Sequence, residues 1–208
     1  MGICAAGFQG ALYRFQRFAG IVGIYAIVVS YLSTQFNSML NINSWLLYML
    51  VVVVLATNTL LSVEAVCCYA IFGNYAMSFH MLSPENPAWG SGDRLLLELK
   101  VIVAKVITTL YCGTVAAFVT RALFNGFQGN TLPAVSHVSL GATFNALFQM
   151  AYFTTTTFVT VGFGDITPAN ICGQLVTLLI EIQAFSIIGV VLASMLATKD
   201  AIAPGQRK

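Results

Sequence analysis

The residues with the clearest chemical role lie at 157–165 and read Thr-Phe-Val-Thr-Val-Gly-Phe-Gly-Asp. Gly162 and Gly164 alternate with larger residues, and glycine reaches positive φ without steric cost. Successive carbonyls of an ordinary strand point to opposite sides, so positive φ at alternate positions is needed to turn them all to one side. Several rings of carbonyl oxygens around one axis can replace the hydration water of a cation. The segment therefore predicts a cation site built from main-chain oxygens.

Two neighbouring features fit the same chemistry. The Thr160 hydroxyl can add one more layer of oxygen, and no carboxylate occurs within 160–164 to favour divalent ions. The apolar stretch 144–157 is too short to span a bilayer and predicts a re-entrant helix. Its C-terminus is the negative end of the helix dipole and would point at a dehydrated cation. Its last residues, Thr154 to Thr157, can hydrogen-bond back to the helix or across to the cation site.

The composition indicates that a membrane surrounds these elements. Of 208 residues, 58% are hydrophobic and 8% are charged, whereas a soluble domain carries about 25% charged residues. The mean hydropathy is +0.85. Long continuous apolar runs exclude the alternating strands of a membrane barrel. We therefore expect an all-α membrane protein with four transmembrane helices, at about 15–33, 45–72, 95–124 and 171–197, and the re-entrant helix and cation site between helices 3 and 4.

The distribution of Lys and Arg predicts the orientation. An even number of spans puts both termini on one side, and that side receives most of the basic residues: Arg14, Arg17, Arg94, Lys199, Arg207 and Lys208. The opposite side receives Arg121. The positive-inside rule then places both termini in the cytoplasm and residues 157–165 on the outer side.

Residues 152–168 resemble the pore region of the tetrameric potassium channel family, and the resemblance extends over about 100–198. It implies a homotetramer, in which three further copies complete the ring, and potassium ions at the filter as the only metal. By this resemblance the ion-coordinating residues are Thr160, Val161, Gly162, Phe163 and Gly164. It also implies that the filter is supported by Tyr152, Phe153, Thr156, Thr157 and Asp165.

Departures from the family pattern narrow this expectation. The family usually has Tyr where this chain has Phe163, so the hydroxyl that ties the filter to surrounding aromatic residues is absent. Val159 stands where Thr is usual, and Thr156 stands where some members carry Glu. Ala184 stands at the usual hinge of the inner helix, which leaves Gly189 as the expected bend point.

Three charged residues lie within the predicted spans, and such residues are candidate functional sites. Glu64 and Lys105 lie at similar depths on adjacent helices, so they could form an ion pair, or Lys105 could extend toward the interface. Glu181, on the last helix, could face the threonines of the re-entrant helix or a central cavity. No span has basic residues at three-residue spacing, which excludes a conventional voltage sensor.

We therefore expect two peripheral helices in 1–94, a pore domain in 95–198 and a short cytoplasmic tail in 199–208. The expected function is passive potassium conduction, with a weakly selective cation channel or a non-conducting structural subunit as alternatives. The partners are membrane lipid and further copies, with room for an accessory subunit. The sequence indicates no cofactor, no nucleic-acid binding and no enzyme, because His80 and His137 are isolated and no nucleophile has a base beside it.

Overall fold

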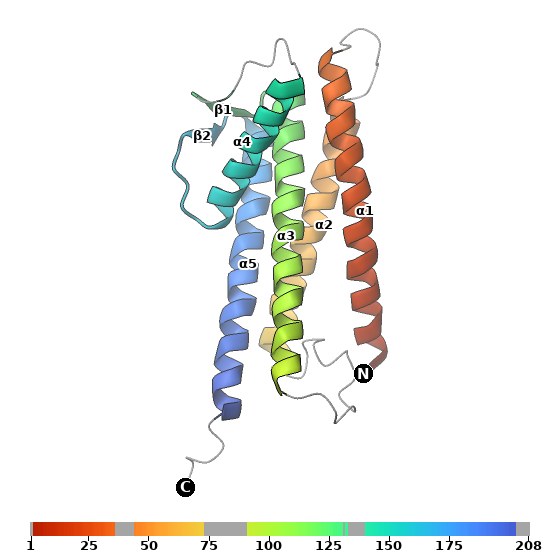
Figure 1. The fold of residues 1–208 in the computed structure, drawn as a ribbon, viewed down its shortest axis with the longest axis vertical. Coiled ribbons are helices and arrows are strands. Elements are labelled where there is room, and N and C mark those ends of the chain that lie inside the picture. The colour runs from red at the N-terminus through yellow and green to blue at the C-terminus, as the bar shows by residue number, and fades with distance from the viewer. Residues whose placement is uncertain (1, 36–43, 73–90, 131, 133–139, 203–208) are drawn as a thin grey trace.

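The computed structural model describes residues 2–35, 44–72, 91–130, 132 and 140–202. These residues form a helical bundle with two short strands near one end (Figure 1). In chain order the elements are α1 Gly2–Gln35, α2 Ser44–Phe72, α3 Ser91–Phe124, β1 Phe127–Gly129, α4 Leu140–Phe158, β2 Ile166–Pro168 and α5 Ile171–Ile202.

Four of these helices contain segments long and apolar enough to cross a membrane, which are Arg14–Leu32, Ser44–Val63, Ile102–Phe124 and Ile171–Gly189. The four apolar helices expected from the sequence are therefore confirmed. Several helices begin earlier than the apolar runs, and α4 begins at Leu140 rather than at 144. Hydropathy marks only the part of a helix that meets lipid or the core, while hydrogen bonding continues through its polar flanks. Parts of the predicted loop 73–94 and of the tail 199–208 lie outside the described residues.

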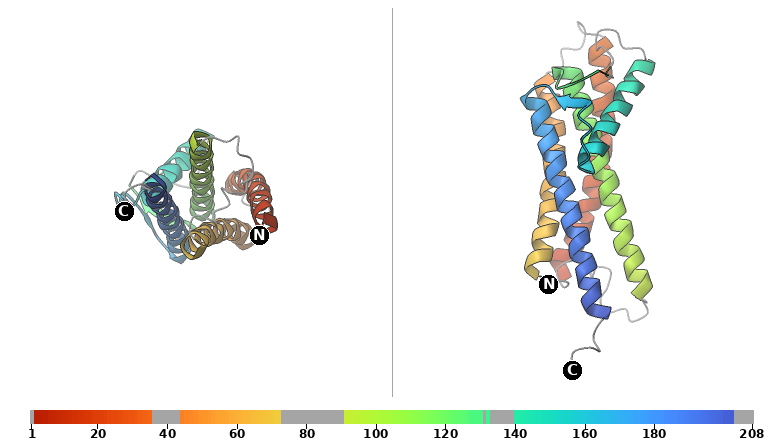
Figure 2. Two further views of the ribbon diagram at one scale, coloured as in Figure 1. Left: turned by 90° about the horizontal axis from the view of Figure 1, so that it is seen from below. Right: turned by 90° about the vertical axis from the view of Figure 1, so that its left-hand side faces the viewer.

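The helices are arranged with α1 and α5 far apart and α2 and α3 between them (Figure 2). The start of α1 and the end of α5 lie at the same end of the bundle, and β1, β2 and α4 lie toward the other end (Figure 1). This arrangement agrees with an even number of spans. It also puts residues 159–165 on the half of the bundle away from both termini.

The Tyr111 side chain of α3 packs closely against the backbone of α1. The Tyr111 hydroxyl donates a hydrogen bond to the Gly20 carbonyl oxygen at 3.0 Å. A Cβ atom on Gly23 would lie 2.7 Å from Cζ of the same ring. The hydrophobic effect does not drive helices together within lipid. Small residues that allow close packing are therefore common where membrane helices meet.

Asn170 fastens the C-terminal end of α3 to the start of α5. Its side-chain oxygen accepts from the Gly173 amide at 3.1 Å, as expected of a helix N-cap, and its amide nitrogen donates to the Phe124 carbonyl at 2.9 Å. Asn125 ends α3 with a φ of 49°. The pairing of β1 with β2 in antiparallel register, Gly129 opposite Ile166, adds a second link at the same end.

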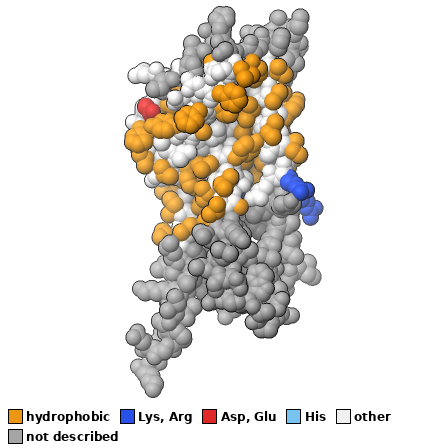
Figure 3. Space-filling view, in the orientation of Figure 1, with side chains coloured by type: hydrophobic (Ala, Val, Ile, Leu, Met, Phe, Trp, Pro, Cys, Tyr) orange, Lys and Arg blue, Asp and Glu red, His pale blue; other side chains and the backbone are white. Residues whose placement is uncertain are grey.

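The bundle surface is rich in exposed apolar side chains (Figure 3). On α5, for example, Ile171 is 79% exposed and Phe185 is 65% exposed, while Ile180 and Ala184 are buried. A soluble domain seldom exposes apolar surface of this extent. This surface therefore faces lipid or other protein chains.

The contact between Gly173 and the chain turn after α3 yields a test of this packing. A Cβ on Gly173 would collide with the main-chain oxygen of Gly126. We expect Gly173→Ala to lower the free energy of unfolding by about 1–3 kcal/mol, because neither backbone can move without disturbing the Asn170 cap. Thermal unfolding of the purified protein in detergent measures this. Gly20→Ala is the matched control, because its Cβ meets nothing within 4 Å; equal melting temperatures for the two variants would contradict the prediction.

Candidate ion-conducting site

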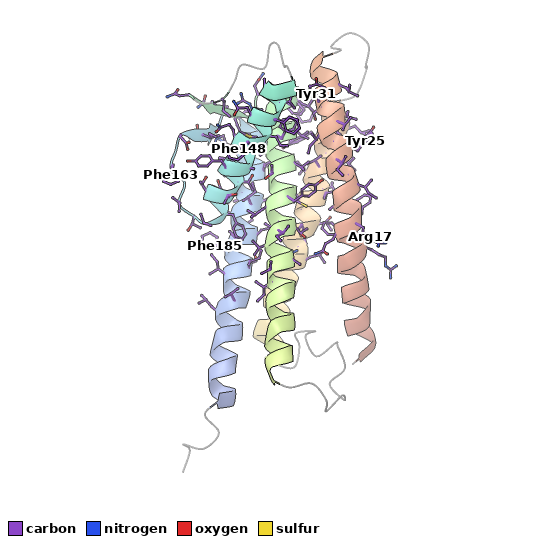
Figure 4. All side chains as sticks on the ribbon, viewed as in Figure 1. Arg17, Tyr25, Tyr31, Phe148, Phe163 and Phe185 are labelled. Atoms are coloured by element: carbon purple, nitrogen blue, oxygen red, sulfur yellow. The ribbon has the colours of Figure 1, made fainter. Side chains whose placement is uncertain are left out.

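The loop between α4 and β2 carries the sequence motif and projects from the side of the molecule remote from α1. Figure 4 shows Phe163 at this edge, with Arg17 and Tyr25 of α1 on the opposite side. Residues 159–165 are all exposed. An exposed loop of mainly apolar residues in a membrane protein needs other protein around it, because its irregular backbone would otherwise face lipid.

The backbone of this loop alternates in handedness. Thr160 has a φ of 60°, Gly162 of 48° and Gly164 of 78°, whereas Val161 and Phe163 between them have no positive φ. A reversal at every second residue turns successive carbonyls toward the same side. Thr160 is β-branched, so its left-handed conformation costs roughly 1–3 kcal/mol and must be held by its surroundings.

Hydrogen bonds to the end of α4 hold that conformation. The Thr157 carbonyl accepts from the Thr160 amide at 2.9 Å. The Thr156 carbonyl accepts from two amides, that of Val161 at 2.9 Å and that of Gly162 at 3.3 Å. The loop amides therefore point back at the helix. Within the described part of the chain, no backbone amide outside the helices and strands donates to the carbonyls of 160–164, so these oxygens are available to a ligand.

The C-terminal half of α4 is seated firmly against the rest of the protein. Thr154 is fully buried, and a Cβ added to Gly113 of α3 would lie 2.7 Å from its methyl group. Phe153 packs on Phe127 of β1, with ring centroids 4.8 Å apart. Thr156 and Thr157, which supply the acceptors for the loop, follow directly on this buried turn.

Tyr152 supports the C-terminal half of the loop. Its ring is stacked on that of Phe163, with centroids 6.2 Å apart and planes 4° apart. Its hydroxyl is hydrogen-bonded to the Asp165 carboxylate, which joins the C-terminal end of the loop to α4. Desolvation, and then the charge and hydrogen bond of Asp165, raise the pKa of Tyr152 above its ordinary value. The phenol is therefore protonated, and able to donate, at neutral pH.

Four of the five predicted supporting residues thus come together with the loop, in different ways. Tyr152 and Asp165 bond to each other, and Thr156 and Thr157 act through their carbonyls. Phe153 points away from the loop and into the core.

The remaining candidates lie apart from the loop. Gly189 lies within α5, which continues as one helix to Ile202. Glu181 is on the exposed side of α5. The Lys105 amine donates to the Asn58 side-chain oxygen at 2.6 Å and to its main-chain oxygen at 3.1 Å. The Glu64 side chain lies outside the described part of the structure, so the suggested pair with Lys105 stays a prediction.

Three features of the site were missed by reasoning from the sequence. The positive φ of Thr160 has no signal in its residue type, because threonine disfavours this conformation. The acceptor role of Thr156 belongs to its main chain, which side-chain chemistry does not reveal. Asn58 and Gln183 are amides within apolar spans, and that feature alone could have identified them as candidates.

Comparison with known proteins supports the channel interpretation. Residues 106–198 match a family model described as an ion channel. The matched range includes most of α3, the whole of α4, the loop and much of α5, whereas α1 and α2 lie outside it. No curated protein and no solved structure matches the chain. The match and the four apolar helices together support an ion channel that is an integral membrane protein.

The bond between Tyr152 and Asp165 gives a pH-dependent test. A pKa raised on folding means that the contribution of Tyr152 is complete below its ordinary pKa of about 10 and is lost as the pH rises through the raised value. We expect Tyr152→Phe to lower the melting temperature at pH 8, and the gap to the unmodified protein to shrink toward pH 11. Tyr25→Phe, at an exposed tyrosine of α1, serves as the control. A gap that stays constant with pH would refute the assignment.

Proposed function

We propose that this chain is one subunit of a potassium-selective channel that conducts potassium passively. The carbonyl oxygens of Thr160, Val161, Gly162 and Phe163, with the Thr160 hydroxyl and the backbone at Gly164, are the proposed ligands of the dehydrated ion. The observation that carries the proposal is the alternating handedness of this segment, with its amides bonded back to α4. A row of unbonded carbonyls on one side suits an ion that must replace its hydration water.

One loop provides only part of a ring of ligands. The proposed assembly is therefore a homotetramer, in which three further copies complete each ring of oxygens. Exposed aromatic side chains on the same side of the molecule as the loop, Phe148 of α4 and Phe185 of α5, support this arrangement (Figure 4). In such a ring the negative C-terminal ends of four α4 helices would stabilise a cation below the filter.

The proposed orientation follows the distribution of basic residues, with both termini in the cytoplasm and the filter facing outward. Gly189 is the proposed bend point of α5, because glycine tolerates a change of backbone angle that Ala184 resists. The proposal includes no voltage sensor and no cofactor, and membrane lipid is the surrounding partner.

A weakly selective cation channel is the second candidate, and one observation favours it. Phe163 is 67% exposed, and its contact with Tyr152 is a ring stack. Phenylalanine has no hydroxyl, so this side chain donates no hydrogen bond. A filter with one fewer hydrogen bond on its outer half could widen enough to admit sodium.

Rubidium flux into liposomes that contain the purified protein tests the proposal. We expect rubidium uptake that an equal concentration of external sodium does not reduce. Strong competition by sodium would favour the second candidate. No flux from a monodisperse tetramer would contradict conduction and favour a structural subunit of a larger membrane complex.

Gly162→Ala tests whether the backbone conformation carries the conduction. An added Cβ at this position meets nothing within 4 Å, so crowding is not a cause of any effect. The φ of 48° disfavours alanine by about 1–2 kcal/mol in every subunit. We expect rubidium flux to fall at least about tenfold, while Gly20→Ala in α1 retains it. Equal flux from the two variants would show that the left-handed conformation at Gly162 is not needed.

Phe163→Tyr tests the missing hydroxyl. A tyrosine at this position keeps the stack on Tyr152 and adds a donor for the surrounding aromatic residues or a neighbouring subunit. We expect the current to decline more slowly during sustained opening in planar-bilayer recordings, because the added hydrogen bond stabilises the filter. An unchanged time course would contradict the idea that Phe163 loosens the filter.

A further inference from the structure

A cluster of buried polar side chains joins α2, α3 and α5 at a place that the proposed ion path does not use. We call it the polar cluster; it consists of Asn58 and Thr59 of α2, Lys105 and Thr109 of α3 and Gln183 of α5. Asn58, Thr109 and Gln183 are fully buried. Polar groups within apolar spans are costly unless they are hydrogen-bonded, so the arrangement of their partners is the informative part.

Lys105 sets the orientation of the Asn58 amide. The ammonium group can only donate, and it donates to the Asn58 side-chain oxygen at 2.6 Å. The Asn58 side-chain nitrogen must therefore face away from Lys105. It donates to the Gln183 side-chain oxygen at 3.0 Å and to the Thr109 hydroxyl at 3.2 Å.

The orientation is then passed to Gln183. Because its side-chain oxygen accepts from Asn58, its nitrogen faces the other way. That nitrogen donates to the Leu55 carbonyl at 3.0 Å and to the Thr59 hydroxyl at 2.6 Å. Both side-chain amides are thus satisfied at the oxygen and at the nitrogen, and the middle of α5 is tied to α2 by three hydrogen bonds.

The cluster holds α5 from the side opposite its free surface. Gln183 is buried, whereas Ile182 and Phe185 are exposed. It lies twelve residues after the start of α5 at Ile171, or about 18 Å along the helix. A second tie is present at the outer end, where the Tyr48 hydroxyl donates to the Cys172 carbonyl at 3.3 Å. Hydrogen bonds therefore join α2 to α5 at two levels, near Cys172 and at Gln183.

We propose that the polar cluster couples α2 to the inner helix of the pore, so that α5 changes its position only together with α2 or after these hydrogen bonds break. Within the membrane no bulk water is present to replace a broken bond, which makes separation of the two helices costly. This inference rests on the proposed function. It assigns a regulatory role to α2, which lies outside the region that matches the channel family: a force or a partner that moves α2 would alter conduction.

A double-mutant cycle on rubidium flux tests the coupling. Asn58→Leu and Gln183→Met each remove the bond between the two amides while keeping side chains of similar size. We expect each variant to change the initial flux by about three- to tenfold in the same direction, and the double variant to match the single variants. Lys105→Met should shift the flux in the same direction, because Asn58 then loses the donor that orients it.

Ser30→Ala is the matched control. Ser30 is a fully buried hydroxyl of α1, and it makes no hydrogen bond within the described part of the structure. Its flux should equal that of the unmodified protein. Single variants whose flux is unchanged, or a double variant whose effect is the product of the single effects, would overturn the proposal. If Asn58→Leu does not assemble, Thr59→Val takes its place in the cycle, because it removes only one acceptor of Gln183.

A second measurement separates failure of this proposal from failure of the proposed function. The same cycle is carried out on the thermal unfolding of the intact protein in detergent. An unmodified protein without flux would contradict conduction, and the unfolding cycle would then decide on the cluster alone. Non-additive melting temperatures would uphold the tie between α2 and α5, and additive ones would overturn it.

Discussion

The carbonyl oxygen of Thr156 is the acceptor on which the conformation of residues 159–165 depends. It lies in the last turn of α4, where a helix leaves its carbonyls without partners, and it accepts from the amides of both Val161 and Gly162. The amides of the loop need hydrogen-bond acceptors, and the carbonyls at the end of α4 supply them. With the amides directed to the helix, the loop carbonyls are left on the other side. A helix terminus that would otherwise need a cap thus becomes the template for a row of carbonyls on one side of the loop.

Such a template is useful only if α4 and the exit of the loop cannot shift. The close contact between Gly113 and Thr154 seats the helix on α3, and the pairing of β1 with β2 holds the chain just beyond Asp165. Asn170 then joins the end of α3 to the start of α5. These contacts are mostly between backbones, or between a side chain and a backbone. The geometry of the loop therefore depends little on the flexible side chains around it.

The sequence predicted the parts of this structure that are governed by local composition. Apolar runs located the four long helices, and glycine spacing located two of the three residues with positive φ in the loop between α4 and β2. The positive φ of Thr160 was not predicted, because α4 imposes this conformation against the preference of threonine. Of the polar cluster, only Lys105 was identified from the sequence as a candidate. To pair Asn58 with Gln183, one must know which sides of α2 and α5 face each other. Hydrophobic periodicity does not show this in helices that are apolar all round.

The separation of the cluster residues along the chain bears on how the protein is made. Asn58 is 47 residues from Lys105 but 125 residues from Gln183. During synthesis α2 and α3 enter the membrane before α5 exists, and at that stage Lys105 and Thr109 are already present to bond the Asn58 amide. The Asn58 amide can therefore be hydrogen-bonded by α3 before α5 is inserted. Insertion of α5 then adds the bond from Asn58 to Gln183 to those that are already present, which makes the hairpin of α2 and α3 a natural intermediate in membrane assembly.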